Sequence, residues 1–374
     1  MKLIYIANIR VPTEKAHGIQ IMKMCEAFSN QGLKLKLVLP WRFNKIKKDV
    51  FDFYGVKRNF KIKKVFSLDL IFLRIPKFGF WIQSLTFSIS AFIYLIFKKT
   101  DIIYSRDPFI LYLISFFKKN FVLELHYIPK NSFLYNRVFK KSKNIIVITK
   151  NLKNELIKKG ILENKILIAP DGVDLEKFDI NISKEEAREK LNLPLDKKIV
   201  LYTGHLYEWK GAQILADASK SLDNNTLIIF VGGTENNIKK FKNRNIDKNN
   251  LLILGYKPYS QIPYYLKASD ILVLPNSGKT EISKDWTSPM KMFEYMVSKR
   301  PIIASDLPSI REILNENNAI LVKSDNSDEL ANSINMALKN QTFSDKISIQ
   351  SYQDVQKYSW FKRSKKIIHF LNND

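Results

Sequence analysis

Residues 275–306, PNSGKTEISKDWTSPMKMFEYMVSKRPIIASD, decide the fold of this chain of 374 residues. An apolar run at 271–274 precedes them and is typical of a buried strand. A polar loop follows, then an amphipathic helix is expected from about Met290 to Ser298, and a second apolar strand at 301–304. A strand, a helix and a strand in this order predict an open α/β sheet, whose ligands bind outside the carboxyl ends of the strands.

The loop of this stretch places polar groups at the start of the expected helix. Thr287 and Ser288 supply hydroxyl groups and Lys291 supplies an ammonium group, and with the free backbone N–H groups they suit a phosphate. Glu294, one turn further on, can accept hydrogen bonds from sugar hydroxyls. A solvated loop ahead of an ordinary surface helix is the alternative, and composition does not separate the two.

Strands and helices alternate along the rest of the chain in two series. The first covers 1–171 and the second 172–358, with a Pro-Asp-Gly hinge between them, and each predicts a parallel sheet with right-handed crossovers. The last segment, 359–374, has apolar residues at helical spacing and is expected to cross back to the first domain. The basic, aromatic section at 41–64 is expected to be a loop and a short hairpin. The fold class is α/β, with two Rossmann-like domains.

The net charge of +25 is concentrated in the first half of the chain. Residues 1–180 hold 33 lysines and arginines against 14 acidic residues, whereas the remaining residues hold 28 against 22. A lysine-rich overall composition explains part of this charge, but the asymmetry points to an anionic surface, either nucleic acid or a membrane. The single cysteine, Cys25, shares a helical face with apolar residues and is expected in the core, which excludes a disulfide framework.

A run of 19 uncharged residues, 79–97, is at the lower limit for a membrane span. Five polar residues interrupt it, and an apolar strand follows almost at once; they are Gln83, Ser84, Thr86, Ser88 and Ser90. A buried or membrane-docking helix is therefore favoured over a span. The N-terminal run MKLIYIANIR is too short for a signal peptide and predicts a first strand.

Two further loops of the second series follow buried strands. In the loop 204–211, GHLYEWKG, Gly204 lets the backbone approach a ligand and Lys210 is within reach of a diphosphate. Its glycine spacing does not fit a Walker loop. Gly232-Gly233 ends another strand. A pair of glycines alone is weak evidence, but three such loops at the strand ends of one domain outline a crevice for a nucleotide diphosphate.

The first half offers fewer candidates. His126 ends a strand within LELHY, where it can hydrogen-bond a reacting sugar or stabilise a leaving group, although a histidine satisfied by neighbouring backbone is the commoner case. Arg10, His17 and Gly18 lie in a loop that leads into a helix N-terminus and can face the diphosphate. Arg106 ends a further strand, with a structural ion pair as the alternative.

No metal site is expected, because the four histidines and one cysteine show no paired ligand spacing. An enzyme that acts on a nucleotide sugar without a metal must neutralise the departing diphosphate with lysine, arginine and helix dipoles. Lys210 and Lys291 fit that need.

Five segments together resemble the group 1, family 4 retaining glycosyltransferases of the GT-B fold, and the resemblance covers nearly the whole chain. The segments are the loop 12–18, the hinge 170–178 (PDGVDLEKF), the loop 204–211, the region 255–265, and the run 288–314 (SPMKMFEYMVSKRPIIASDLPSIREIL). The last is the strongest match, a variant of the family's E-x7-E region. The GT-B fold implies two Rossmann-like domains facing across a cleft, with the C-terminal helix crossing back to the first domain.

The resemblance implies roles for single residues. Glu294 matches the glutamate that binds ribose hydroxyls, Lys210 the lysine on the diphosphate, His126 the histidine near the transferred sugar, and Gly18 the glycine by the phosphates. From the residues and the resemblance together, the donor-side candidates are Gly18, Gly204, His205, Lys210, Gly233, Tyr256, Thr287, Ser288, Lys291 and Glu294, and the candidates on the acceptor or membrane side are Arg10, His17 and Arg106.

Two positions depart from the family's pattern. His205 stands where an arginine is usual, and Trp286 stands where the first glutamate of E-x7-E is usual. Pro289 removes one backbone donor, so Lys291 is expected to supply the phosphate contact instead. The change at Trp286 bears on the contacts with the sugar ring, and hence on the donor.

The resemblance implies a glycosyltransferase that moves a hexose-type sugar from a UDP- or GDP-sugar to a glycan or lipid-linked acceptor, with retention and without a metal. Domain 1–171, with 359–374, is expected to bind the acceptor, and domain 172–358 the donor. The product belongs to cell-surface polysaccharide, lipopolysaccharide or glycoprotein glycan. The nucleotide sugar is the co-substrate, and no other cofactor is expected. The expected location is cytoplasmic, peripherally on the inner face of the plasma membrane, with an anionic membrane surface as partner and no nucleic acid.

Two alternatives stay open. A non-catalytic GT-B subunit is suggested by Trp286 in place of the glutamate. A nucleic-acid-binding protein is suggested by the charge of +25, but the sequence has no recognition helix, RNP-like strand or zinc motif.

Overall fold

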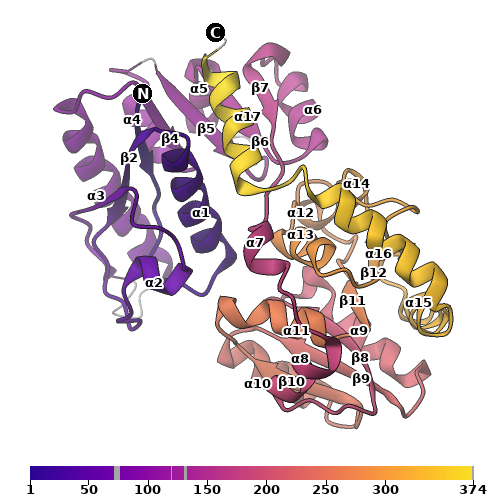
Figure 1. Cartoon of the computed structure of the whole chain (residues 1–374). Coiled ribbons are helices and arrows are strands. Elements are labelled where there is room, and N and C mark those ends of the chain that lie inside the picture. The colour runs from indigo at the N-terminus through magenta and orange to yellow at the C-terminus, as the bar shows by residue number, and fades with distance from the viewer. Residues whose placement is uncertain (71–75, 119, 130–132, 373–374) are drawn as a thin grey trace. The chain divides into compact units, whose positions relative to one another are not determined.

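The computed structural model describes residues 1–70, 76–118, 120–129 and 133–372, and it divides into two compact units (Figure 1). The first unit comprises Met1–Asp171 and Trp360–Asp374, and the second comprises Gly172–Ser359. Residues 373 and 374, which close the helix expected at 359–374, lie outside the described residues.

The first unit is built on a seven-stranded parallel sheet in the order β3-β2-β1-β4-β5-β6-β7. Its central strands read as continuous apolar runs, because a parallel sheet is covered on both faces. The strands are β1 Lys2–Ile6, β2 Lys34–Pro40, β3 Lys61–Val65, β4 Ile102–Ser105, β5 Phe121–Leu125, β6 Asn144–Val147 and β7 Ile166–Ile168. The helices are α1 Ala16–Asn30, α2 Val50–Tyr54, α3 Pro76–Ile96, α4 Pro108–Ile114, α5 Phe133–Lys141, α6 Lys150–Lys158 and α17 Trp360–Asn372, with a 3₁₀ turn, η2, at Glu163–Lys165.

The hairpin expected within 41–64 is wrong. Strand β3 runs parallel to β2 at the edge of the sheet, so a crossover rather than a tight turn must join them. The short helix α2 lies in that crossover. The Asp49 side chain caps it by accepting from the backbone N–H of Phe51 at 2.8 Å, and Gly55, with φ 58°, ends it.

Helix α17 returns to the first unit, as expected. It buries Trp360, Ser364, Ile367 and Leu371 on one face, and it lies against α1 (Figure 1). These positions recur at three- and four-residue intervals, which is the pattern of an amphipathic helix. Arg363 is buried on the same face, and its partners are described below.

The second unit repeats the architecture with a six-stranded parallel sheet in the order β10-β9-β8-β11-β12-β13. Two Rossmann-like parallel sheets, with a C-terminal helix on the first unit, confirm the predicted fold class. The strands are β8 Lys198–Thr203, β9 Thr226–Val231, β10 Leu251–Gly255, β11 Ile271–Leu274, β12 Ile302–Asp306 and β13 Ile320–Lys323. The helices are α7 Leu175–Phe178, α8 Lys184–Leu191, α9 Ala212–Ala218, α10 Glu235–Arg244, α11 Ile262–Ala268, α12 Glu281–Lys284, α13 Met290–Val297, α14 Pro308–Arg311, α15 Ser327–Lys339 and α16 Gln341–Val355, with 3₁₀ turns η3 Glu208–Lys210, η4 Ser219–Ser221 and η5 Tyr259–Gln261.

Alternate residues of β8 pack into two separate hydrophobic clusters. Ile199 and Leu201 join the cluster under α11 and α13, whereas Val200 and Tyr202 join the cluster under α9 and α15. Helices therefore cover both faces of the sheet. In such folds, ligands bind beyond the carboxyl ends of the strands.

The stretch 275–306 folds largely as expected, with β11, α13 and β12 in that order. The polar loop differs, because it contains the short helix α12. The Thr280 side chain caps this helix by accepting from the backbone N–H of Ser283.

Candidate functional site

The order of strands in the second unit marks one edge of the sheet. The chain moves outward from β8 to β9 and β10, then returns to the other side of β8 with β11. This reversal is a topological switch point, and ligands in such folds bind beyond the carboxyl ends of the strands there. The predicted residues Gly204, Lys210 and Lys291 all follow these two strands.

Glycines allow the loops at these strand ends to meet backbone to backbone. A Cβ atom at Gly211 would overlap the carbonyl group of Pro275, and one at Gly232 would overlap the backbone of Gly204. Both glycines also have positive φ, 71° and 119°. The loops that follow β8, β9 and β11 are therefore in direct contact.

Lys291 brings a buried ammonium group to these loops. Lys291 is 9% exposed, and its Nζ has no hydrogen-bond partner among the described residues. Nζ lies 3.8 Å from the centre of the Tyr202 ring, and the side chain lies next to Gly204. Burial, reinforced by the nearby Lys210, holds the pKa of Lys291 well below its usual value. A buried ammonium group with no acceptor is the signature of a site completed by an anion.

Glu294 lies one helical turn after Lys291 and is 5% exposed. Tyr259, from η5, donates a hydrogen bond of 2.9 Å to its Oε1. Burial raises the pKa of Glu294 to about 7, against the opposing effects of Tyr259, Lys291 and Lys210. Burial lowers the pKa of Lys210 to about 8, and Glu294 partly offsets this.

These three charged groups can bind different parts of a nucleoside diphosphate. Lys210 and Lys291 supply two ammonium groups for a diphosphate, and Lys210 helps to lower the pKa of Lys291. Glu294, with Oε1 already held by Tyr259, can accept from neighbouring hydroxyls. The predicted grouping of Lys210, Lys291 and Glu294 is thus present in the structure, while their roles stay predictions.

The other predicted donor-side residues lie along the same edge of the sheet. The His205 ring stacks on Tyr207 at 5.0 Å, and Tyr202 donates to its backbone carbonyl at 2.7 Å. Ser288 is buried and Thr287 half-buried immediately before α13, and Trp286 is half-buried. The remaining two follow β9 and β10: Gly233, packed on Leu206 and Ile238, and Tyr256, which is 40% exposed.

In the first unit, His126 follows β5 and binds a buried carboxylate. Its Nε2 lies 2.7 Å from Oε1 of Glu124, which is itself 1% exposed. Glu124 also accepts hydrogen bonds from Gln20 at 2.8 Å, Arg363 of α17 at 3.1 Å, and the Tyr104 hydroxyl. Burial alone would raise the pKa of Glu124, but Arg363 and His126 outweigh it and hold that pKa well below its usual value.

This environment fixes the protonation of His126. Burial, with a further effect of Arg106, lowers the pKa of His126 below its usual value, so the ring is neutral at pH 7. An ionised carboxylate can only accept, so Nε2 carries the proton that points to Glu124. Nδ1 is then left as an acceptor, which suits a sugar hydroxyl.

The remaining residues predicted for the first unit are held by their own neighbours. Arg10 lies 3.5 Å from Asp69, and Arg106 donates to Oε1 of Gln20 at 3.0 Å. The half-buried His17 lies in the first turn of α1. Gly18 follows it, and a Cβ atom there would overlap the hydroxyl of Tyr54. Local packing therefore accounts for this glycine, while its proposed position by phosphates stays a prediction.

Five residues of these clusters were not predicted from the sequence: Tyr259, Glu124, Arg363, Gln20 and Tyr104. Glu124 carried a signal, because it is the charged residue of a strand that is otherwise apolar, FVLEL. Tyr259 and Arg363 carried none, because their partners are 35 and 239 residues away in the chain.

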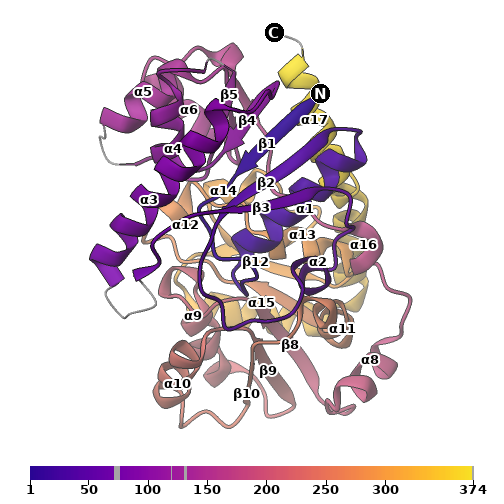
Figure 2. The same ribbon diagram turned by 90° about the vertical axis from the view of Figure 1, so that its left-hand side faces the viewer.

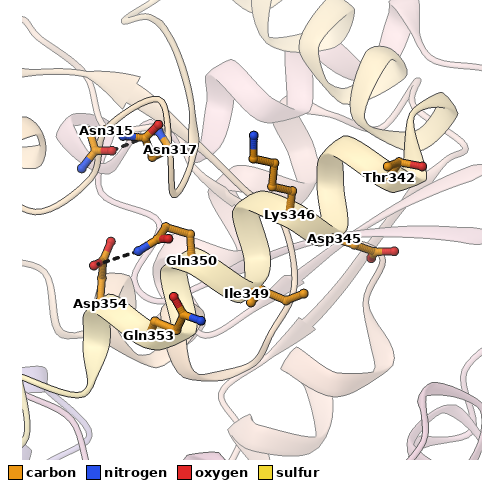
Figure 3. A pocket seen from close by; sticks show the side chains of 9 residues that line it. All are labelled: Asn315, Asn317, Thr342, Asp345, Lys346, Ile349, Gln350, Gln353 and Asp354. Carbon is orange, nitrogen blue, oxygen red and sulfur yellow. Dashed lines mark hydrogen bonds between the residues drawn. The ribbon is translucent and has the colours of Figure 1, made fainter.

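A hollow of about 810 Å³ lies along α16, away from these groups (Figure 3). Asn315 and Asn317 form its other wall, and they precede β13 at the amino edge of the sheet. None of the predicted residues lines it. The loops at the carboxyl edge are therefore the better candidate for a ligand site.

No group of three or more metal-binding side chains occurs within the described parts of the chain.

The second unit is similar to a known protein family. Residues 183–354 match the family model "Glycosyl transferases group 1". The putative teichuronic acid biosynthesis glycosyltransferase TuaC of Bacillus subtilis is 24% identical over 63% of this chain and 57% of its own length. A UDP-Gal:alpha-D-GlcNAc-diphosphoundecaprenol alpha-1,3-galactosyltransferase of Escherichia coli is 31% identical over 46% of this chain and 44% of its own length. The chain thus spans about half the length of these curated relatives, and the resemblance seen in the sequence is confirmed.

The fold has close structural counterparts over the whole chain. Anabaena HepE, solved in complex with UDP-glucose, superimposes with a TM-score of 0.77 at 16% identity and covers 100% of both chains. Such neighbours identify the fold as GT-B.

Proposed function

The chain carries a group 1 glycosyl transferase domain over residues 183–354, and from this premise we propose that it transfers a hexose-type sugar from a nucleotide diphosphate to a glycan or lipid-linked acceptor. One observation carries the proposal. Lys291 presents a buried ammonium group with no hydrogen-bond partner in the described part of the chain, beside Lys210 at the strand ends. A diphosphate supplies the negative charge that this pair lacks.

The donor in this proposal is a UDP-sugar. The Escherichia coli relative is named for UDP-galactose, and the HepE structure contains UDP-glucose. Glu294 accepts from the ribose hydroxyls, and the two lysines contact the diphosphate. Because Lys291 is buried and Lys210 is half-buried, their attraction for the charge that develops on the leaving diphosphate is stronger than it would be in water.

The reaction breaks the bond between the anomeric carbon and the diphosphate and forms a bond from that carbon to an acceptor hydroxyl. The hydroxyl proton leaves with the diphosphate, and the configuration of the sugar is retained. No metal is needed in this scheme, because Lys210 and Lys291 carry the compensating charge. The neutral His126 ring accepts a hydrogen bond at Nδ1 from a hydroxyl of the transferred sugar and so positions it.

The acceptor in this proposal is lipid-linked, and transfer takes place on the cytoplasmic face of the plasma membrane. The name of the Escherichia coli relative, which includes diphosphoundecaprenol, supports a lipid-linked acceptor. The excess of positive charge in residues 1–180 supports an anionic surface nearby.

Calorimetric titration with UDP, GDP and ADP, followed by transfer assays with their sugars in the presence of a chelator, tests the proposal. We expect UDP to bind most tightly, and transfer to survive chelation. His126→Ala is expected to abolish transfer while leaving UDP affinity unchanged. Failure of every nucleotide to bind would contradict the proposal and favour a non-catalytic subunit, the alternative suggested by Trp286.

A further inference from the structure

Helix α3 turns its polar side chains into the first unit and its large apolar side chains outward. Gln83, Ser84 and Ser88 are at most 2% exposed. Gln83 Nε2 donates to Asn8 Oδ1 at 2.9 Å, and Asn8 Nδ2 donates to Ser84 Oγ at 3.1 Å. The outward row consists of Trp81 (58% exposed), Leu85 (59%), Ile89 (45%) and Ile93 (52%).

This arrangement is the reverse of a surface helix in water, which turns its polar side outward. The outward row repeats every four residues, so its members lie one above the other on the helix. Phe78 and Ile96, 65% and 44% exposed, extend the row at its two ends. From one end to the other it is roughly 27 Å long at 1.5 Å per residue.

Neighbouring helices widen the apolar face. Helix α4 lies beside α3 (Figure 2), and the Phe117 ring that follows α4 packs on Phe92 of α3 at 5.1 Å. Phe116 and Phe117 are 53% and 69% exposed. Trp81 packs on Phe109 of α4 at 5.5 Å. We name the outward row of α3, together with Phe116 and Phe117, the apolar face.

Positive charge borders the apolar face. Lys98 and Lys99 are exposed directly after α3, and the edge strand β3, which contacts α3, exposes three more lysines: Lys61, Lys63 and Lys64. Residues 76–118 contain two acidic side chains, Asp101 and Asp107. Asp101 accepts from the backbone N–H of Lys2 at 2.7 Å, and Asp107 caps α4. An uncovered apolar row bordered by lysines is the composition of a helix that lies in the surface of an anionic membrane.

Helix α3 is long and apolar enough to cross a membrane by length and composition, over Phe78–Ile96. Its other side is nevertheless used inside the first unit. Phe87, Ala91 and Leu95 are at most 1% exposed, and the polar bonds to Asn8 lie on that same side. One side of the helix is therefore left for lipid, so it lies flat rather than spanning.

We propose that the apolar face docks on an anionic phospholipid bilayer, with the row of α3 at the boundary of headgroups and acyl chains. The bordering lysines contact lipid phosphates. A second copy of the chain fits less well, because two copies would bring the same lysines together. The docking does not rest on sugar transfer, so vesicle binding and nucleotide binding test the two proposals separately.

Flotation of the full chain with vesicles tests the docking. Wild-type protein is expected to bind vesicles with about one third phosphatidylglycerol and to bind pure phosphatidylcholine at least about tenfold more weakly, because several lysines act together. The double variant Leu85→Glu/Ile89→Glu is expected to lose at least about tenfold in apparent affinity for the anionic vesicles. The matched control is Ile246→Glu, an 85% exposed isoleucine of the second unit, which is expected to bind as the wild type does.

Lipids brominated on the acyl chain report depth, because they quench a tryptophan that reaches the acyl boundary. Quenching is expected in the wild type and is expected to fall in Trp81→Phe, which retains a ring at that position. Ile93→Ser, a milder change, is expected to reduce binding about threefold to tenfold and guards against misfolding of the double variant. Far-UV circular dichroism checks that each variant is folded.

Three results would overturn the proposal. Equal binding of the folded double variant and the wild type would show that the apolar face is not used. Equal binding to neutral and anionic vesicles would remove the role of the lysines. A dimer of the wild type that the double variant loses, without vesicle binding by either, would assign the face to a second copy.

Discussion

The two units have sheets of the same kind, but the buried charges at their strand ends are in opposite states. In the first unit, Glu124 accepts from Gln20, Tyr104 and Arg363 and also holds His126. In the second, Nζ of Lys291 is buried and finds no hydrogen-bond partner in the ranges that the structure describes. The Glu124 carboxylate has partners on both of its oxygens, although Nη1 of Arg363 beside it finds no hydrogen-bond partner among the described residues. The Lys291 ammonium group lacks an anion.

This difference separates two uses of a buried charge. A charge whose bonds are all made by the protein stabilises one arrangement, which here fixes the orientation and protonation of His126. A charge left without a partner costs stability until a ligand supplies one, so it marks where a ligand binds. The comparison predicts opposite outcomes when a charge is removed from each cluster.

The largest expected effect is on the stability of the first unit. Glu124→Ala leaves Arg363 as a buried charge without its carboxylate, and it is expected to lower the free energy of unfolding by about 3–5 kcal/mol. Urea unfolding, followed through the transition of the first unit, measures this change in the free energy of unfolding. Glu155→Ala, which removes an i,i+3 pair with Lys158 on the surface, is the control and is expected to cost about 0.5 kcal/mol or less. The double variant Glu124→Gln/Arg363→Met is expected to be more stable than Glu124→Ala, and a still lower stability would refute the account.

In the second unit, the same kind of change is expected to affect ligand binding instead. Lys291→Met is expected to weaken UDP binding by about 2–4 kcal/mol, or roughly 30- to 1,000-fold, and not to lower stability. Titration calorimetry and thermal melts measure the two quantities. Lys267→Met is the control, because Lys267 is also buried in this unit but lies 3.8 Å from Asp179. If Lys291→Met lowered the free energy of unfolding without weakening UDP binding, the proposed difference between the two clusters would be wrong.

Glu294 sharpens the contrast through pH. Its pKa of about 7 in the folded protein exceeds the value of about 4.3 for an unfolded glutamate, so Glu294 loses its proton at a lower pH in the unfolded state. The free energy of unfolding therefore falls as pH rises between these two values. Glu294→Gln removes the titration and can still accept from Tyr259. The free energy of unfolding of this variant minus that of the wild type is expected to be about 2–3 kcal/mol larger at pH 8 than at pH 5. Equal differences at the two pH values in chemical unfolding would contradict a raised pKa.

The smallest expected effect is the pH dependence of UDP binding. Lys210 has a pKa of about 8 in the free protein, and a bound diphosphate favours its protonated form. Above pH 8 the lysine must take up a proton to bind, so the Kd for UDP is expected to rise by about tenfold per pH unit. Lys210→Arg stays charged and is expected to reduce this slope, and the pH dependence that remains is assigned to Lys291, whose pKa is also lowered. A wild-type Kd that is constant from pH 7 to pH 9.5 would show that Lys210 does not contact the diphosphate.

The sequence predicted the elements whose pattern is local. The apolar run at 271–274 and the helix from Met290 were placed almost to the residue, because each shows its own periodicity. The helical spacing of Trp360, Ser364, Ile367, Ile368 and Leu371 predicted the packing face of α17 in the same way, although Ile368 is only half-buried. The strand β3 was placed in a hairpin because three of its five residues are lysines, and the sequence gives no sign of a parallel partner.

Contacts between distant segments could not be predicted. The pairs Tyr259–Glu294 and Arg363–Glu124 join residues that no periodicity connects. The sequence pattern could not predict the orientation of α3 either, because a stripe of polar residues ordinarily marks the side of a helix that faces solvent. Here Asn8, in the loop after β1, accepts from Gln83 and donates to Ser84, so these polar side chains point into the first unit.

The bond between Arg363 and Glu124 also bears on the order in which the protein is made. Arg363 is synthesised 239 residues after Glu124, and it also donates to the backbone carbonyls of Ala169 and Pro170. The second unit is a continuous stretch of chain, so all of its strands leave the ribosome before this arginine does. Translation therefore completes the first unit after the second, although β1 is translated before every strand of the second unit.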